Sequence, residues 1–185
     1  MPARVPPTYY RGYKPHLHRR IAREFAQARC IVDLGCGDCG LATLLSGRDH
    51  HEVFGVDLSD DRFPKQPNPP HGRHCIKADA RSLGFLSPGS VDAVVSVWAL
   101  HEFAAPMAVL REARRILRPG GEILIVDFPR GSLAQRLWDE RYCTTIEVGG
   151  MLKRAGFTRV AARRIARGHL TWARGFKPPR QRGAR

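Results

Sequence analysis

The 185-residue sequence lacks any apolar stretch that approaches the roughly 20 residues of a membrane-spanning helix. Its first residues, Met1-Pro-Ala-Arg-Val-Pro-Pro, also lack the apolar core of a signal peptide. No internal repeat is present, and the length suits one domain without a second catalytic domain. We therefore expect a cytoplasmic protein with no membrane association.

Cysteines are few, and their number is odd. The five stand at positions 30, 36, 39, 75 and 143, which is not the pattern of a secreted disulfide framework. Cys36 and Cys39 have the spacing of a metal-binding or redox pair, but no second Cys or His pair has matching spacing. We therefore predict no metal site, and we interpret both cysteines as small residues that fit a tight turn.

Acidic residues are missing from the C-terminal part of a chain whose net charge is +14. Residues 153–185 contain eleven Lys and Arg and no acid, and residues 1–29 contain seven against one. Residues 30–152 contain thirteen against sixteen, so a general arginine bias does not explain the basic ends. Such ends favour a polyanion, most naturally RNA, bound through phosphates and interleaved aromatic rings. A solvated tail that serves solubility is the alternative.

A glycine-rich turn is the most informative segment that the sequence contains. Ile31-Val-Asp-Leu-Gly-Cys-Gly-Asp-Cys-Gly40 reads as an apolar strand, an acid at its end and a turn that opens a helix. Glycines let the backbone take positive φ and approach a ligand closely, while the helix start presents unpaired N–H groups. The segment therefore predicts a nucleotide-like cofactor.

Two carboxylates distinguish between the cofactors that such a turn binds. The glycine spacing also fits the dinucleotide fingerprint, but Asp33 would repel a pyrophosphate and attract an ammonium group. Asp57 ends a second predicted strand, 20 residues beyond Gly37, where it can accept hydrogen bonds from ribose hydroxyls. An adenosine that carries an amino-acid moiety satisfies both acids.

Five segments, in order and at the spacing of alternating strands and helices, resemble the class I S-adenosylmethionine-dependent methyltransferases. They are Val32-Asp-Leu-Gly-Cys-Gly37, Gly55-Val-Asp-Leu-Ser59, Lys77-Ala-Asp-Ala80, Val91-Asp-Ala-Val-Val-Ser-Val-Trp98 and Leu117-Arg-Pro-Gly-Gly-Glu-Ile-Leu-Ile-Val-Asp127. The resemblance covers about residues 30–175. It implies an α/β fold with a Rossmann-like, seven-stranded sheet, mostly parallel with an antiparallel last strand and with helices on both faces.

The resemblance also implies S-adenosylmethionine as cofactor and S-adenosylhomocysteine as product. Asp33, Gly35 and Gly37 would flank the methionine part, Asp57 the ribose, and Asp79 with Ala80 the adenine edge. We assign four neighbouring residues to the same site: Cys36, Leu58, Ser96 and Val97. Many family members have a third glycine where this chain has Cys39, and the following Gly40 could carry the turn instead.

Candidate catalytic residues follow the fourth predicted strand. Trp98 could stack on a flat acceptor, His101 could take a proton near neutral pH, and Glu102 could do the same or orient the histidine. The alternative is that Trp98 and His101 only pack beside the cofactor. Asp127 ends the next strand at the same edge, and Tyr9, Tyr13, His16 and His18 precede the first strand, where family members fold a segment over the cofactor's carboxylate.

Apolar periodicity places the elements of this fold. It predicts strands at about 30–34, 53–57, 74–78, 91–97, 122–128, 158–165 and 169–175, and helices at 17–28, 40–46, 105–117, 133–142 and 145–155. Residues 60–72 hold four prolines, so the family's usual second helix is shortened or replaced by a loop. We divide the chain into a basic segment and helix at 1–29, the methyltransferase domain at 30–175 and a basic disordered tail at 176–185.

The acceptor is less well defined by the sequence. The glycine loop and Gly175-Phe-Lys-Pro-Pro179 resemble the ribosomal-RNA-processing adenine methyltransferases, whereas Ala99-Leu-His-Glu-Phe103 resembles the type 11 group, which includes quinone and other small-molecule methyltransferases. With the basic ends, the sequence favours a tRNA or rRNA base. A small-molecule methyltransferase and a non-catalytic, cofactor-binding assembly module are the alternatives. RNA would bind the basic N- and C-terminal segments, and a protein partner or homodimer could assist.

Overall fold

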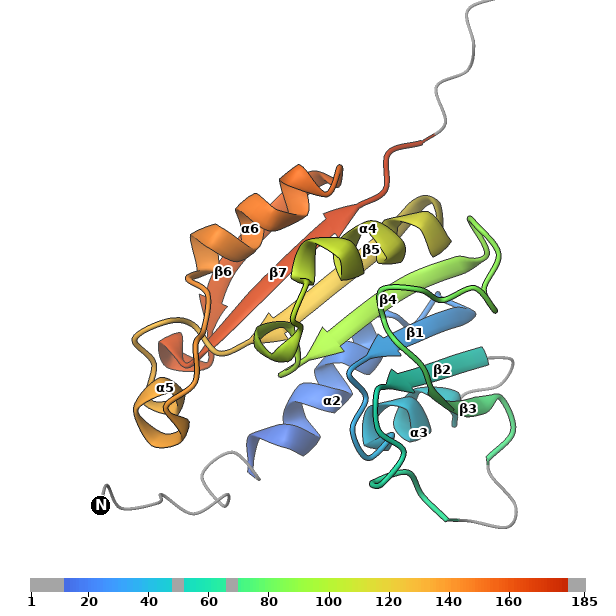
Figure 1. Ribbon diagram of the computed structural model, residues 1–185, viewed down its shortest axis with the longest axis horizontal. Helices are drawn as coiled ribbons and strands as arrows, with labels where there is room; N and C mark the ends of the chain where they lie inside the picture. Colours follow the sequence, from blue (N-terminus) through green and yellow to red (C-terminus); the bar gives the residue numbers. More distant parts are fainter. Residues whose placement is uncertain (1–11, 48–51, 66–69, 180–185) are drawn as a thin grey trace, which may run out of the picture.

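The computed structural model describes residues 12–47, 52–65 and 70–179. Seven strands form one sheet in the order β3-β2-β1-β4-β5-β7-β6 (Figure 1). Neighbouring strands are parallel except for the two pairs that involve β7, which are antiparallel. The predicted α/β sheet, mostly parallel with an antiparallel last strand, is confirmed.

The strand order reverses beside the first strand. The strands are β1 (Cys30–Leu34), β2 (Glu52–Asp57), β3 (Arg73–Lys77), β4 (Val91–Val97), β5 (Leu117–Asp127), β6 (Thr158–Ile165) and β7 (Leu170–Phe176). The chain runs outward from β1 to β3 and then returns to β4 on the other side of β1. The carboxyl ends of β1 and β4 therefore form the crevice where open α/β sheets bind ligands.

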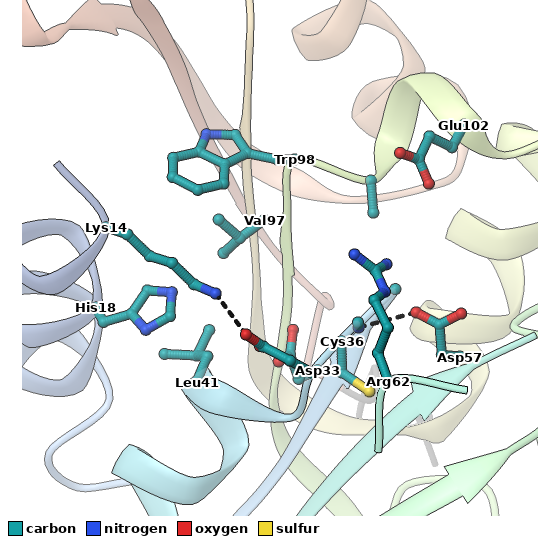
Figure 2. Close-up of a pocket in the computed structure, with 14 residues that line it drawn as sticks. Lys14, His18, Asp33, Cys36, Leu41, Asp57, Arg62, Val97, Trp98 and Glu102 are labelled. Atoms are coloured by element: carbon teal, nitrogen blue, oxygen red, sulfur yellow. Dashed lines mark hydrogen bonds and ion pairs between the residues drawn. The ribbon is translucent and has the colours of Figure 1, made fainter. Parts of the chain in front are cut away.

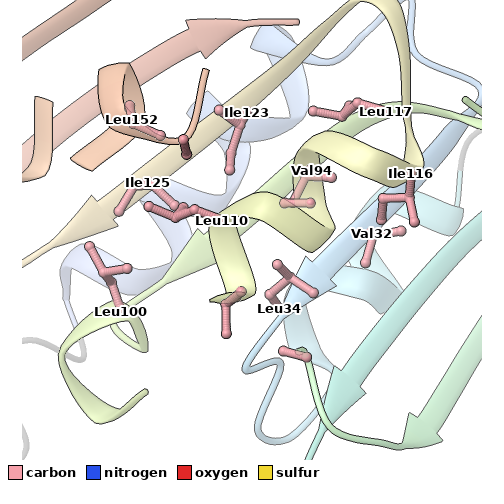
Figure 3. Close-up of a cluster of buried hydrophobic side chains, with 14 of the residues drawn as sticks. Val32, Leu34, Val94, Leu100, Leu110, Ile116, Leu117, Ile123, Ile125 and Leu152 are labelled. Carbon is pink, nitrogen blue, oxygen red and sulfur yellow. The ribbon is translucent and has the colours of Figure 1, made fainter. Parts of the chain in front are cut away.

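Helices cover both faces of the sheet, as predicted. On one face, α2 (Tyr13–Glu24), α3 (Gly40–Ser46) and the short α5 (Leu133–Trp138) contribute to one hydrophobic core. On the other, α4 (Pro106–Ile116) and α6 (Thr145–Arg154) pack Leu110, Ile116 and Leu152 against the strands (Figure 3). Two 3-10 turns, η1 (Leu100–Glu102) and η2 (Ala166–Gly168), lie at the carboxyl ends of β4 and β6.

Local sequence signals explain several element boundaries. Leu17, Ile21 and Phe25 share one buried face, which seats α2 against the sheet. Thr144 caps α6 through a capping box in which its hydroxyl accepts from the N–H of Glu147 and its own N–H donates to the Glu147 carboxylate. No helix occurs at residues 58–65 or 70–72, so the loss of the usual second helix is confirmed for the described part of that segment.

Some predicted boundaries differ from the structure. The first helix occupies Tyr13–Glu24 rather than 17–28, and α5 ends at Trp138 because Asp139 takes a left-handed φ of 53°. The fifth strand begins at Leu117, which pairs with Val91 before an irregularity in register, whereas the turn sequence suggested a start near 122.

The ordered chain also continues past the boundary predicted for the tail. Phe176 belongs to β7, and the N–H of Lys177 donates to the carbonyl of Gly121 at 2.9 Å. Residues 180–185 lie outside the described part, so the remainder of the predicted tail stays a prediction.

Candidate functional site

The glycine-rich turn adopts the left-handed conformations that its sequence predicts. Gly35 and Gly37 have φ of 71° and 56°, and Cys39, which stands where many relatives carry a third glycine, has a φ of 54° as the residue that caps α3. The N–H of Gly35 donates to the carbonyl of Val56 at 2.8 Å, which fixes the turn to the end of β2. The turn therefore presents bare backbone to the crevice.

Gly35 also has a steric reason to be glycine. A Cβ at this position would lie 2.3 Å from the Cβ of Ala99, in the segment that follows β4. The glycine-rich turn and the segment that follows β4 can approach each other this closely only because residue 35 has no side chain. This close approach forms the narrow boundary between two adjoining cavities.

The first cavity lies over the glycine turn, with the Asp33 carboxylate in its wall (Figure 2). Asp33 is 2% exposed, and burial, followed by the nearby charges of Asp38 and Asp57, raises its pKa to about 7. A buried carboxylate that lacks a cationic partner favours protonation, and a cation placed beside it restores the charge. The site is therefore suited to receive a positively charged group.

Cations line the same cavity as Asp33. Lys14, from α2, pairs with Asp38 of the glycine loop at 2.9 Å, and the Arg62 guanidinium lies beside Gly37. His18 is buried next to them, and burial together with Lys14 lowers its pKa to about 4, so it is neutral at pH 7. A cavity with one buried acid and two cations at its mouth fits a zwitterionic amino-acid group.

The second cavity continues past Asp57. One oxygen of Asp57 accepts from the N–H of Gly37 at 2.8 Å, and the other accepts from the N–H of Ser59 at 3.2 Å, so the carboxylate is held at the junction. Leu58, Asp79 and Ala80 line this cavity, together with apolar residues after η1. Its lining contains more apolar than polar surface, which suits a flat purine.

Most of the predicted cofactor residues therefore meet at one site. Those that line one or both cavities are Asp33, Gly35, Cys36, Gly37, Asp57, Leu58, Asp79, Ala80 and Val97. Ser96 lines neither, because its hydroxyl donates to the carbonyl of Leu34 at 2.9 Å inside the sheet and joins β4 to β1. The donor set, from the buried acid to the apolar recess, fits S-adenosylmethionine.

Sequence reasoning missed Lys14, Arg62 and Asp38 as site residues. The spacing of Lys14 and His18, one helical turn apart, is the only sequence signal that could have grouped them. Of the four residues proposed before the first strand, His18 lines the first cavity, Tyr13 and His16 line neither of the two cavities, and Tyr9 lies outside the described residues.

Trp98 occupies an unusual backbone conformation at the end of β4. Its φ is 55°, which is rare for a bulky residue. The indole lines the first cavity and stacks on Phe128, with ring centroids 5.6 Å apart and an interplanar angle of 10°. Trp138 and Tyr142 pack on other sides of Phe128. The aromatic group thus supports Trp98 as a flat surface at the acceptor side.

His101 is held between two carboxylates. Its Nδ1 lies 2.8 Å from Asp127 and its Nε2 lies 2.8 Å from Glu140, while its backbone N–H donates to Asp127 at 3.0 Å. Burial by itself lowers the pKa of His101, but the hydrogen bond and charge of Asp127, with Glu140, outweigh it, and the pKa is raised. Both ring nitrogens therefore have partners within the protein.

Glu102 extends from η1 into the boundary between the two cavities. Partial burial raises the pKa of Glu102 and the nearby charge of Glu140 adds to this effect, whereas His101 opposes it; the side chain remains 66% exposed. A carboxylate with a raised pKa is a better proton acceptor than one at its ordinary value. Of the three predicted catalytic residues, Trp98 and Glu102 face the first cavity and His101 supports its wall.

The cysteines in the glycine turn have a partner that their spacing did not reveal. Cys39 is bonded to Cys75 of β3, and the Cys36 sulfur lies 3.5 Å from that of Cys39. The sulfurs pack against Gly55, where a Cβ would meet them at 2.9 and 3.0 Å. The expectation of simple packing was therefore wrong for Cys39, because the fold brings β3 beside the turn.

Within residues 12–47, 52–65 and 70–179, no group of three or more His, Cys, Asp or Glu is arranged to hold a metal ion. In the same ranges, no helix combines the length and apolar character needed to cross a bilayer.

Comparison with known proteins agrees with this geometry. The type 11 family, described as a methyltransferase domain, matches residues 32–125. A fatty-acid O-methyltransferase of Mycolicibacterium smegmatis is 29% identical over 113 residues, which cover 60% of this chain and 41% of that protein. The chain thus spans less than half the length of this relative.

Solved structures share the fold at low sequence identity. A complex of the Haloferax volcanii Trm112 methyltransferase activator with a methyltransferase gives a TM-score of 0.70 at 20% identity, covering 91% of this chain and 92% of the matched one. The Burkholderia thailandensis 1,6-didemethyltoxoflavin-N1-methyltransferase, with its substrate and S-adenosylhomocysteine bound, gives 0.67 at 22%, covering 87% and 76%. Because the family match spans residues 32–125, more than half of the chain, the chain belongs to the type 11 family of methyltransferase domains.

Proposed function

We propose that this protein binds S-adenosylmethionine and transfers its methyl group to a nucleophilic atom of an RNA base. The charge arrangement of the first cavity supports the cofactor. Asp33 would hold the ammonium group, and Lys14 and Arg62 would face the carboxylate of the same amino-acid moiety. Asp57 would accept from the ribose hydroxyls, and the recess beside Asp79 would hold the adenine.

The bound cofactor supplies an electrophilic methyl group, and the protein's part is to position an acceptor and manage one proton. Trp98, fixed by its stack on Phe128, would provide a face for a planar ring. Glu102, at the cavity boundary with a raised pKa, would accept the proton. His101 acts as a positioning residue, since Asp127 and Glu140 occupy both of its nitrogens.

The charge of the chain supports the choice of RNA, because residues 153–185 hold eleven Lys and Arg and no acid, whereas residues 30–152 hold thirteen against sixteen acids. Of the residues that line the first cavity, Trp98 and Glu102 are the two that we assign to the acceptor, and they offer a stacking face and one carboxylate. A small apolar substrate needs an enclosed apolar chamber to gain affinity. A base presented from outside by a larger molecule needs only a stacking face and polar contacts to its edge.

A small-molecule acceptor is the second candidate, and the similarity to a fatty-acid O-methyltransferase favours it. The two candidates, and a third in which the protein only binds cofactor, are separated by one labelling experiment. The protein would be incubated with methyl-labelled S-adenosylmethionine and separated total RNA, protein and metabolite fractions. The variant Asp33→Asn would control for label that does not depend on the site.

We expect label in the RNA fraction and its loss in the control variant. Label in extractable metabolites alone would assign the protein to the small-molecule class. Cofactor binding without label in any fraction would indicate a non-catalytic module.

A further inference from the structure

All the Asp, Glu, Lys and Arg residues of the hairpin formed by β6, η2 and β7 are cationic. Between Thr158 and Phe176 the chain has five arginines and no acid. Arg163, Arg164 and Arg167 are exposed, and within the described residues none of the three forms an ion pair. The hairpin forms one edge of the sheet (Figure 1).

The opposite edge of the same sheet provides an internal comparison. There, His74 of β3 lies 2.6 Å from Glu52, and Lys77 lies 2.8 Å from Asp60. Charged side chains at a sheet edge often have the sole role of preventing pairing with another strand. This role does not require charges of one sign, because the β3 edge has oppositely charged pairs. The excess positive charge at the β6 edge therefore needs another explanation.

The register of the strands places these arginines near the acceptor side. Arg164 is in register with Thr171 of β7, and Thr171 is in register with Asp127 of β5, whose carboxylate holds His101. Two strand spacings separate the backbones of Arg164 and Asp127, a distance of about 10 Å. Arg167 follows in η2, at the same edge of the sheet as the carboxyl ends of β4 and β5.

The aromatic rings of the hairpin do not add a stacking surface. Trp172, which has the Arg20 guanidinium of α2 at 4.4 Å from its centroid, is 3% exposed and belongs to the core. The Arg159 guanidinium lies 4.1 Å from the centroid of Phe176, at the opposite end of the hairpin from η2. The exposed arginines, rather than stacking rings, therefore indicate a ligand surface on the hairpin.

We propose that the β6–η2–β7 hairpin binds the phosphate backbone of the RNA, with Arg163, Arg164 and Arg167 as the principal contacts. The inference rests on the proposed function and specifies its partner surface. Phosphates favour the arginine edge and are repelled by Glu102 and Glu140 at the acceptor side, so the charges orient the strand. A base, which is uncharged, can then extend toward Trp98.

Binding of full-length protein to a fluorescent single-stranded RNA of about 20 nucleotides tests this surface, measured by anisotropy over a range of salt concentrations. The variant R163A/R164A/R167A removes the proposed contacts. The matched control R23A/R111A/R154A removes three exposed arginines from α2, α4 and α6, outside the hairpin. S-adenosylmethionine affinity, measured by calorimetry, reports whether each variant remains folded.

The hairpin variant should bind RNA about 10- to 100-fold more weakly than the native protein, with a slope of log affinity against log salt that is smaller by about 2. The control should stay within about threefold of the native affinity. Equal RNA affinity for both variants would overturn the proposal. It would also be overturned if native protein bound poly-glutamate as tightly as RNA through the same arginines, since the surface would then suit an acidic peptide.

The two measurements distinguish a failure of the arginine surface from a failure of the proposed methyl transfer to RNA. A hairpin that binds RNA in a protein that labels only metabolites would refute the proposed function and leave the surface standing. Unchanged labelling of RNA by R163A/R164A/R167A would refute the arginine surface and leave the proposed function standing.

Discussion

The two halves of the sheet form the site in different ways. On the β1–β2 side, Asp33, Gly35 and Gly37 lie within five residues of chain, and Asp57 joins them from the adjacent strand. On the β4–β5–β6 side, His101 meets Asp127 and Glu140 from separate segments, and the arginine edge lies two strands further along the sheet. The cofactor half is thus local in sequence, whereas the acceptor half is assembled by tertiary contacts.

The difference has an electrostatic counterpart. The buried charge of the cofactor half, Asp33, has no cationic partner at bonding distance in the described residues, and its pKa is raised to about 7. The buried charge of the acceptor half, His101, is clamped on both sides by acids. Asp33, which has no cationic partner within the described residues, and His101, whose two nitrogens already have acidic partners, are expected to respond differently to substitution.

Asp33→Asn should produce the largest effect. The substitution keeps the size of the side chain but removes the charge that would face the ammonium group, so cofactor affinity should fall about 10- to 100-fold. Isothermal titration calorimetry measures the loss, and Asp139→Asn, an exposed position outside both cavities, is the matched control. Native-like affinity in Asp33→Asn would show that the cofactor half does not bind its ligand through this charge.

The same variant should be more stable than the native protein at high pH. The folded-state pKa of Asp33 is raised from 3.8 to about 7, so its contribution to stability is complete below 3.8 and is lost as pH rises through about 7. Asp33→Asn without cofactor should therefore gain stability at pH 8 and little at pH 4, as measured by urea unfolding. A variant that loses stability at pH 8 would contradict this assignment.

Gly35→Ala should follow in size. The methyl group would lie 2.3 Å from Ala99 and would also impose a φ of +71° on an L residue. Gly120→Ala separates these causes, because Gly120 has a φ of +79° and no atom lies within 4 Å of the place that an added methyl group would take. Cofactor affinity should fall at least about 10-fold in Gly35→Ala, whereas Gly120→Ala should lose only about 1 kcal/mol of stability. A similar cofactor affinity of the two variants would exclude the close approach to Ala99 as the cause of the lost affinity.

Cofactor affinity of the native protein should depend on pH through Asp33. Binding of a cation requires the ionised carboxylate, so affinity should be constant above pH 7 and fall up to about tenfold per pH unit below it. Calorimetry over a pH series on both sides of this value gives the profile, and the Asp33→Asn profile should be nearly flat. A pH-independent native affinity would mean that the pocket keeps Asp33 ionised without its ligand.

Glu140→Gln should have the smallest effect. Glu140 contributes to raising the pKa of His101. A histidine whose pKa is raised in the folded state stabilises the fold below pH 6.5, and this contribution is lost as pH rises through the folded-state pKa. The half-exposed Glu140 limits the cost to about 0.5–1 kcal/mol at pH 6, with less at pH 9. Unfolding at both pH values tests this, and turnover should fall with unchanged cofactor affinity if His101 positions the acceptor side.

Sequence reasoning was accurate where neighbours in the chain form the contacts. The strands at 30–34 and 91–97 and the helix at 40–46 were predicted to the residue, because buried parallel strands are continuous apolar runs and the glycine turn defines the helix start. It was less accurate at α5, where Asp139 ends the helix early, and at Ser96, whose hydroxyl turns to Leu34 instead of the cavity. Both depend on packing that no local pattern encodes.

The sequence by itself determined the class of fold, the glycine turn and the two carboxylates that define the cofactor half, since residues close in the chain and at strand ends create that geometry. Only the tertiary structure decided that Lys14 faces Asp38, that Cys39 meets Cys75, that His101 is enclosed by two acids, and that the exposed arginines of β6 stand without acidic partners in the described part of the chain. The reason is that charge pairing and burial depend on which distant segments the sheet order brings together, and that order is fixed by packing of the whole core.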